Sequence, residues 1–167
     1  LAGESSGHTS TIVFGSTNDL NGANVFYEFN TKTMKLGTQH ASGILTLRSG
    51  NGTNALTIDA SQNVGIGTTS PDTLLHLKST SASKPVLTIE NEQGGSNPTA
   101  LRFKRVTSSP ADDDNIAQIE FRINNDADED TLYSYIQAIA TDVSDGTEDA
   151  KLDFFTMKAG TATRTLT

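Results

Sequence analysis

Residues 119–123, with the sequence Ile-Glu-Phe-Arg-Ile, decide the fold class. Apolar and charged side chains alternate along this stretch, as they do in a β-strand with one buried and one solvated face. Similar runs recur along the chain, and no window has the spacing of an amphipathic helix. The sequence therefore predicts an all-β chain of at least ten short strands. The other alternating runs lie at residues 12–14, 25–29, 45–47, 56–58, 75–77, 87–89, 101–103, 133–139 and 155–157.

The residues between these runs are typical of turns, as in Asn21-Gly22, Asn97-Pro98 and Asp145-Gly146. The chain has 167 residues, enough for one ordinary domain or two small ones. Its formal net charge of −8 offers no basic surface for nucleic acid, and no apolar stretch is long enough to span a bilayer. Because the chain has no cysteine, it has neither a disulfide framework nor a thiolate metal site.

Two parts of the chain resemble each other. Residues 45–57 align without gaps on residues 155–167, and residues 12–26 match residues 119–133 upstream. The sequence therefore predicts tandem β-units: residues 1–62, incomplete at their start, and residues 81–167, with a junction at 63–80. The second unit ends where a further unit would begin, so we expect the parent polypeptide to continue.

The junction has a sequence similar to that of a known family. Residues 63–71, Asn-Val-Gly-Ile-Gly-Thr-Thr-Ser-Pro, resemble a junction of bacteriophage tail fibres that often precedes a C-terminal self-cleaving chaperone domain. Residues 116–167 resemble repeat units of marine phage fibres, with Ile-x-Phe at 119–121, Tyr-x-x-Ile-x-Ala at 133–138 and Asp-Gly-Thr at 145–147. The resemblance implies a homotrimeric, β-rich rod on a virion, a stiff shaft that carries a host-receptor-binding tip. Some bacterial trimeric adhesins have similar junctions, so an adhesin stalk on the cell surface stays open as an alternative.

Physical reasoning favours an assembly of the same kind. A narrow sheet with two or three inward apolar residues per strand leaves one face and its edges uncovered, and three copies about a common axis can cover them. We therefore expect an elongated homotrimeric fibre of short strands, built as a β-prism, a triple β-helix or a trimer of small β-sandwiches. The expected partners are two further copies and adjacent fibre segments of the same polypeptide, with a host glycan or protein bound through a distal tip. The alternatives are a monomeric β-sandwich with an arm and a carbohydrate-binding module that contacts the receptor directly.

Particular residues are expected to build the trimer axis and the junction. The glycines and the proline at the junction are expected to form turns, since glycine permits tight backbone conformations and proline restricts the residue before it. A phosphate-binding loop is the weaker interpretation, because the spacing and lysine of GxxxxGK[ST] are missing. The axial residues are Ile58, Val64, Ile66 and Leu77 at the junction, with Ile119, Phe121 and Ile123 in the second unit, and the turn residues are Gly65, Gly67 and Pro71.

Asp126, Asp128 and Asp130 are the candidate calcium ligands, because carboxylate oxygens at alternate positions suit Ca²⁺. The glycine and glutamate of an EF-hand loop are missing, so a solvated acidic loop is the favoured interpretation. Glycoside hydrolysis is disfavoured, since aromatic residues make up only 6% of the chain and no tryptophan is present to stack on a sugar. The sequence thus predicts a structural protein, with no enzymatic activity and no cofactor.

Overall fold

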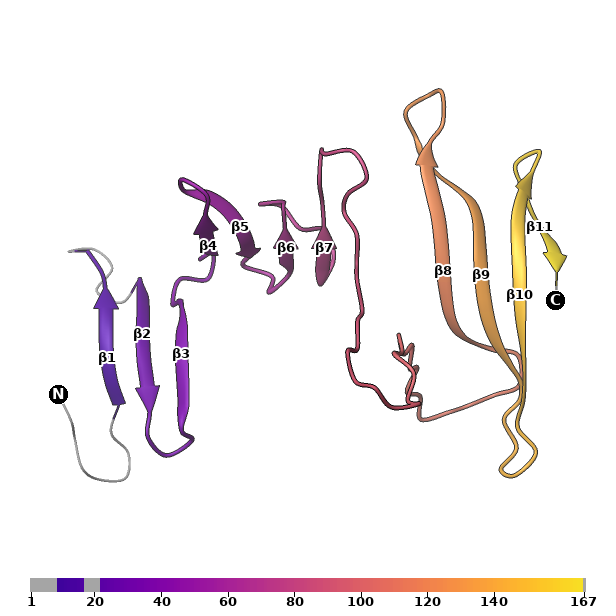
Figure 1. Cartoon of the computed structure of the whole chain (residues 1–167), viewed down its shortest axis with the longest axis horizontal. Helices are drawn as coiled ribbons and strands as arrows, with labels where there is room; N and C mark the ends of the chain where they lie inside the picture. Colours follow the sequence, from indigo (N-terminus) through magenta and orange to yellow (C-terminus); the bar gives the residue numbers. More distant parts are fainter. Residues whose placement is uncertain (1–8, 17–21, 167) are drawn as a thin grey trace. The chain divides into compact units, whose positions relative to one another are not determined.

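The computed structural model describes residues 9–16 and 22–166, and these residues form strands and loops without a helix. The first sheet has three antiparallel strands in the order β1-β2-β3 (Figure 1). Residues 29–32 close the turn between the second and third strands, where Lys32 has a φ of 54°. The strands are β1 (Thr9–Phe14), β2 (Ala23–Glu28) and β3 (Thr33–Thr38).

The second sheet has four strands in the order β4-β5-β6-β7. Its first pair is a hairpin whose turn residues, Gly50, Asn51 and Gly52, all have a positive φ, which glycine and asparagine tolerate. The last pair, β6 and β7, is parallel and is joined by the loop 67–74. The strands are β4 (Leu45–Ser49), β5 (Thr53–Ile58), β6 (Val64–Ile66) and β7 (Leu75–Leu77).

The third sheet is an antiparallel meander in the order β11-β10-β9-β8. Three of its strands are long, with 11, 13 and 10 residues, where the sequence pattern predicts short strands. Bulges add Ile116 to β8 and Tyr133 and Thr141 to β9, and each extra residue interrupts the apolar alternation, so these two strands look like shorter runs. The strands are β8 (Asp114–Asn124), β9 (Asp130–Asp142), β10 (Asp149–Lys158) and β11 (Thr161–Leu166).

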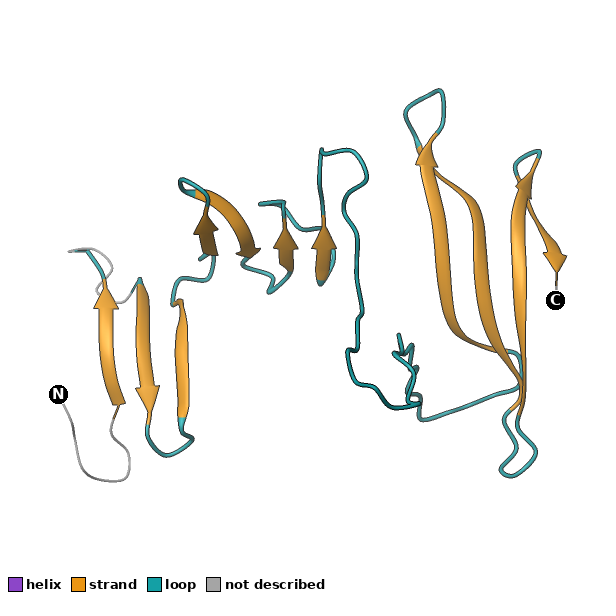
Figure 2. Ribbon diagram, viewed as in Figure 1, coloured by secondary structure: helices purple, strands orange, loops and turns teal. Residues whose placement is uncertain are grey.

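Residues 78–113 contain no strand (Figure 2). The prediction of strands at 87–89 and 101–103 is therefore wrong for the lone chain. Alternation indicates which face of a strand prefers burial. A strand also needs a neighbouring backbone with which to form hydrogen bonds, and residues 87–89 and 101–103 have no such partner in the described sheets.

The chain divides into two compact units, residues 1–88 and 89–167. The predicted junction at 63–80 lies inside the first unit, because β6 and β7 extend the sheet that β4 and β5 begin. The hairpins β4–β5 and β10–β11 share one detail: Ala55 and Thr165 are the extra residues of β-bulges, each just before a leucine near the end of its strand. The two bulges occupy equivalent positions in the alignment of residues 45–57 on residues 155–167.

Very little of the chain is buried. Ile139, with 8% of its surface exposed, and Pro71 are the two buried apolar side chains among the described residues. The chain exposes 13113 Å². A compact protein of 17.7 kDa would expose about 8,000 Å², and two separate compact halves about 9,600 Å². The excess over even the two separate halves is about 3,500 Å². Among the described residues many large apolar side chains are exposed, with Met34, Leu74 and Val106 exposing 72%, 77% and 81% of their surface.

Candidate functional site: the apolar sheet faces

The second sheet, formed by β4 to β7, contains the predicted junction and is here called the junction sheet. It has one continuous apolar face. Residues directly opposite each other on neighbouring strands project to the same side of a sheet, so the strand register defines two apolar rows across all four strands. The sequence-predicted residues Ile58, Val64, Ile66 and Leu77 all lie on this side. The junction face consists of the row Leu45, Ile58, Val64 and Leu75 and the row Leu47, Leu56, Ile66 and Leu77.

The junction face is partly exposed, whereas the opposite face of the same sheet is closed. Ile66, Leu47 and Leu75 expose between 45% and 57% of their surface. On the other side Thr57 exposes 1%, and Pro71 is buried as well. The loop after β6 folds back over this closed side. Further apolar packing of the sheet is therefore available only on the junction face.

Gly65 and Gly67 have different structural roles. Gly65 lies within β6, so its predicted place in a turn is wrong. A Cβ at Gly65 would lie 2.7 Å from the carbonyl oxygen of Thr68, so the folded-back loop requires a residue without a side chain. Gly67 has a φ of 75° at the end of β6, as expected for a turn glycine. Pro71 is held against the closed face rather than at a solvent-exposed turn.

The turn between β5 and β6 is organised by one carboxylate. Asp59 accepts hydrogen bonds from the backbone N–H groups of Ser61 and Asn63, at 2.8 and 2.9 Å, and from the Asn63 side chain at 3.1 Å. These donors, the Asn63 backbone N–H above all, lower the pKa of Asp59 below its usual value. Gln62 takes a φ of 68° in this turn. The Asp59 carboxylate thus fixes where β6 starts.

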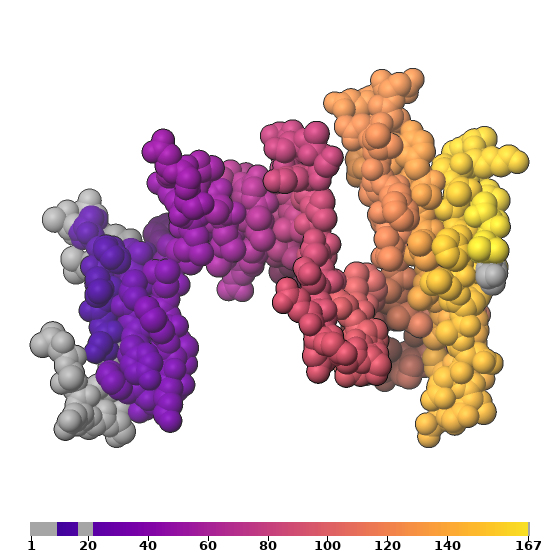
Figure 3. Space-filling model, in the orientation of Figure 1, coloured from indigo at the N-terminus to yellow at the C-terminus, as the bar shows by residue number. Residues whose placement is uncertain are grey.

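The third sheet has a comparable surface, here called the second apolar face. Ile119 lies opposite Ile136, Ile136 lies opposite Phe154, and Phe154 lies opposite Leu166, so one apolar row crosses all four strands. The next row contains Ala117, Ala138 and Leu152. Figure 3 shows the strands of this sheet, orange to yellow, as a space-filling surface.

The predicted residues of β8 share this face. Ile119, Phe121 and Ile123 alternate along β8 without a bulge between them, and they expose 42%, 51% and 67% of their surface. The bulge next to Phe121 lies on the partner strand, where Tyr133 is the extra residue. The structure thus brings each predicted set together on its own sheet.

The opposite face of the third sheet contains residues that sequence reasoning missed. The Asp153 carboxylate is fully buried, and the Arg164 guanidinium lies 3.0 Å from it without a well-aligned hydrogen bond. The rings of Tyr135 and Phe155 stack with centroids 4.4 Å apart, and Arg164 lies over the Phe155 ring. The sequence signal was an acidic residue within an otherwise apolar strand, at Leu152-Asp153-Phe154.

The first sheet follows the same scheme. Ile12, Val25 and Leu36 are cross-strand neighbours and form one row. Ile12 and Leu36 expose 62% and 52% of their surface. The other face has polar contacts, among them the ion pair between Lys35 and Glu28 at 3.0 Å. All three sheets therefore present one apolar face that is incompletely covered.

The acidic residues Asp126, Asp128 and Glu129 lie in the loop 125–129 of the β8–β9 hairpin, and Asp130 is the first residue of β9. Asn125 organises this loop, because its side-chain oxygen accepts hydrogen bonds from the N–H groups of Ala127 and Glu129. Asp130 pairs with Arg122 at 3.0 Å, and Asp128 accepts a hydrogen bond from Asn124. Among the described residues, no group of three or more acidic, histidine or cysteine side chains could hold a metal ion. The geometry therefore does not support calcium binding by Asp126, Asp128 and Asp130.

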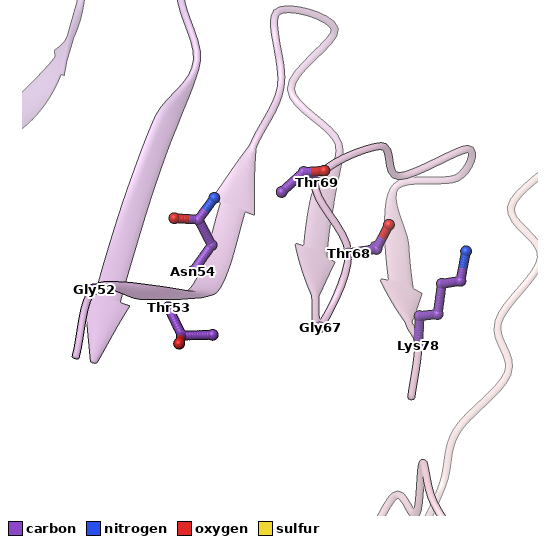
Figure 4. A pocket seen from close by; sticks show the side chains of 7 residues that line it. All are labelled: Gly52, Thr53, Asn54, Gly67, Thr68, Thr69 and Lys78. Atoms are coloured by element: carbon purple, nitrogen blue, oxygen red, sulfur yellow. The ribbon is translucent and has the colours of Figure 1, made fainter. Parts of the chain in front are cut away.

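A polar hollow of about 560 Å³ lies at one end of the junction sheet. Figure 4 shows Thr68 and Thr69 between Asn54 and Lys78. Gly67 also lines the hollow, but its positive φ and its close approach to the Lys78 carbonyl account for a glycine there. A helix does not follow this loop in the described chain, so the arrangement differs from a phosphate-binding loop.

Comparisons with protein-family models, with curated proteins and with solved structures find no match for this chain. Within the described residues, no helix is long and apolar enough to cross a membrane. The functional interpretation therefore depends on the sequence resemblance and on the exposed sheet faces.

Proposed function

We propose that this chain is part of a homotrimeric phage tail fibre, in which it forms a stiff shaft segment that carries a host-receptor-binding tip. The observation that supports this most is the set of apolar rows that run across entire sheets while one face stays uncovered. The junction face alone includes eight apolar side chains from four strands. Large exposed apolar surfaces are typical of protein–protein contacts, and this supports an obligate partner.

The excess exposed area of the chain is similar to the area that an obligate assembly buries. The excess exposed area of about 3,500 Å² lies in the range of about 2,000–5,000 Å² that obligate interfaces bury. Burying apolar area stabilises by roughly 25 cal/mol per Å², so association would dominate the stability of the chain. The sequence resemblance favours three copies about one axis.

The mechanism of such a segment is mechanical. Many backbone hydrogen bonds and apolar contacts must break together before the rod bends or unravels, so the force from the tip is transmitted along the shaft. The acidic surface, with a net charge of −8, discourages lateral association of neighbouring fibres. This role requires neither a cofactor nor catalysis, and it places the protein on the virion.

The genes that flank this gene and the shape of the purified protein in electron micrographs test this proposal. Baseplate and tail genes beside this gene, together with rods in electron micrographs of the purified trimer, would support a tail fibre. A membrane-anchor segment in the same polypeptide would instead indicate an adhesin stalk. Binding of the isolated chain on a glycan array would indicate direct receptor recognition and would contradict a purely structural segment.

A further inference from the structure

The stretch between β7 and β8 has unused backbone hydrogen-bonding groups. In the structure as described, residues 85–110 form no backbone–backbone hydrogen bond and belong to no strand. Backbone N–H and C=O groups normally pair, and a connection this long without structure of its own is uncommon in a compact domain. The stretch therefore has the backbone capacity for additional strands.

Two parts of this stretch have strand-like sequences. In the first segment, residues 85–90, Leu87 and Ile89 alternate with Thr88 and Glu90, and the two apolar residues expose 64% and 45% of their surface. In the second segment, residues 101–106, Leu101 and Phe103 expose 59% and 49%. Both segments thus present an apolar side that lacks a sheet.

The second segment is already held beside the third sheet. Arg105 forms an ion pair with Asp114 at 2.9 Å and donates a hydrogen bond to the carbonyl oxygen of Asn115 at 3.0 Å. Phe103 lines a small apolar hollow of about 90 Å³ together with Ile119 and Leu152 of the second apolar face. The segment is therefore anchored by side chains while its backbone stays unpaired.

The two segments have complementary charges. The first segment ends in Glu90, whereas the second contains Arg102, Lys104 and Arg105. Within the described chain, Glu90, Arg102 and Lys104 form no ion pair. In an antiparallel ladder that joins the segments, Glu90 would be a diagonal neighbour of Arg102 on the same face.

We propose that the first segment of one copy pairs as an antiparallel strand with the second segment of a neighbouring copy, so that these strands form only on assembly. The inference rests on the proposed trimer. Residues 91–100 would allow the two segments to pair within one chain, yet the lone chain leaves both unpaired, so a second copy is the occupant that the structure favours. A contact between two different surfaces closes into a ring under three-fold rotation. The expected register places Leu87 opposite Phe103 and Thr88 opposite Arg102.

Disulfide trapping tests this pairing, because the chain contains no cysteine. The double variant Thr88→Cys/Arg102→Cys is oxidised under native conditions and separated on a denaturing, non-reducing gel. Pairing between copies predicts bands of two and three chains that collapse to one chain on reduction. The matched control is Thr88→Cys/Ser108→Cys, whose second cysteine lies beyond the segment and should give far less cross-linking.

The single variants Thr88→Cys and Arg102→Cys are mixed and refolded together. This experiment distinguishes pairing between two copies from pairing within one chain. A disulfide between the two kinds of chain is expected only if the strands pair between copies. The native mass of each sample is measured in parallel. A trimeric mass with cross-links only within single chains, or with none, would overturn the strand pairing and leave the fibre proposal standing. A monomeric mass would overturn both.

Discussion

Gly65 of β6 lies directly opposite Thr57 of β5, and the two residues share the closed face of the junction sheet. Thr57 exposes 1% of its surface, and Pro71 covers the same side. Because the chain itself covers this side, the apolar residues of β4 to β7 have only the opposite side on which to meet a partner. The Gly65–Thr57 pair thus marks the face of the sheet that the chain itself covers.

Replacing Gly65 by alanine is expected to destabilise the protein by about 1–3 kcal/mol, the usual cost of forcing atoms into a filled site. The new Cβ would lie 2.7 Å from the carbonyl oxygen of Thr68 and 2.9 Å from its Cγ2. Chemical denaturation measures the loss. The control is Gly37→Ala in β3, where a Cβ meets nothing within 4 Å and the stability should change by no more than about 1 kcal/mol. Equal effects of the two substitutions would contradict the close-packing argument.

The double variant Val64→Asp/Ile66→Asp introduces two charges on the junction face. Because a carboxylate buried in an apolar contact is strongly unfavourable, we expect loss of the trimer and of cooperative folding. Size-exclusion chromatography and thermal melting by circular dichroism measure these two effects. The control Thr69→Asp/Ser70→Asp changes exposed loop residues and should keep both properties. A well-folded monomer of the junction variant would be inconsistent with the scheme.

Removing Arg164 is expected to leave the buried Asp153 carboxylate without its partner. Breaking a fully buried ion pair lowers the free energy of unfolding by about 3–5 kcal/mol. Because Arg164 is half exposed, we expect Arg164→Ala to lower it by less than this. Adding Asp153→Asn to that variant should recover part of the loss, since the uncompensated charge is gone. Denaturation curves for the single and double variants give the coupling energy. Strict additivity of the two substitutions would show that the pair is not coupled.

The Asp59 turn predicts a particular dependence of stability on pH. The Asn63 backbone N–H and the other donors lower the pKa of Asp59 from its ordinary value of 3.8. The carboxylate therefore stabilises the fold fully above the unfolded-state pKa, and this stabilisation is lost as the pH falls through the lower, folded-state pKa.

The Asp59→Asn variant is the matched test of that dependence. It should melt below the wild type at pH 7, and the difference should shrink as the pH falls below about 4. Asp145→Asn, in the exposed Asp145-Gly146 turn, is the control and should lack this trend. A constant difference in melting temperature across the pH range would show that the Asp59 charge has no role.

The all-β class could be predicted from the sequence, and so could the face that the predicted residues of β5 to β8 occupy, because period-two alternation reports the side of a strand directly. In β9 and β10 the alternating residues Tyr135 and Phe155 lie on the opposite face, whereas Ile136 and Phe154 form the apolar row. Val64 and Ile66, like Ile119 and Phe121, share a face in the structure as the pattern indicates. The length of the strands could not be predicted as well, because one extra residue, such as Tyr133, shifts the periodicity of a long strand.

Contacts that depend on folding of the chain were beyond sequence reasoning. The loop that folds over Gly65 and the burial of Asp153 result from segments meeting in space, and no local pattern specifies them. The alternating residues at 87–89 and 101–103 suggested strands, but a ladder depends on which backbone lies alongside. The gap-free alignment of 45–57 on 155–167 likewise concealed different strand lengths, although the bulges at Ala55 and Thr165 coincide.

The mass of the purified chain in solution, measured by light scattering, tests the central claim most directly. One chain has a mass of 17.7 kDa. If the uncovered sheet faces pack about a three-fold axis, the measured mass is three times this value and stays so on dilution until the protein unfolds. A folded, cooperatively melting species with the mass of one chain would contradict the account.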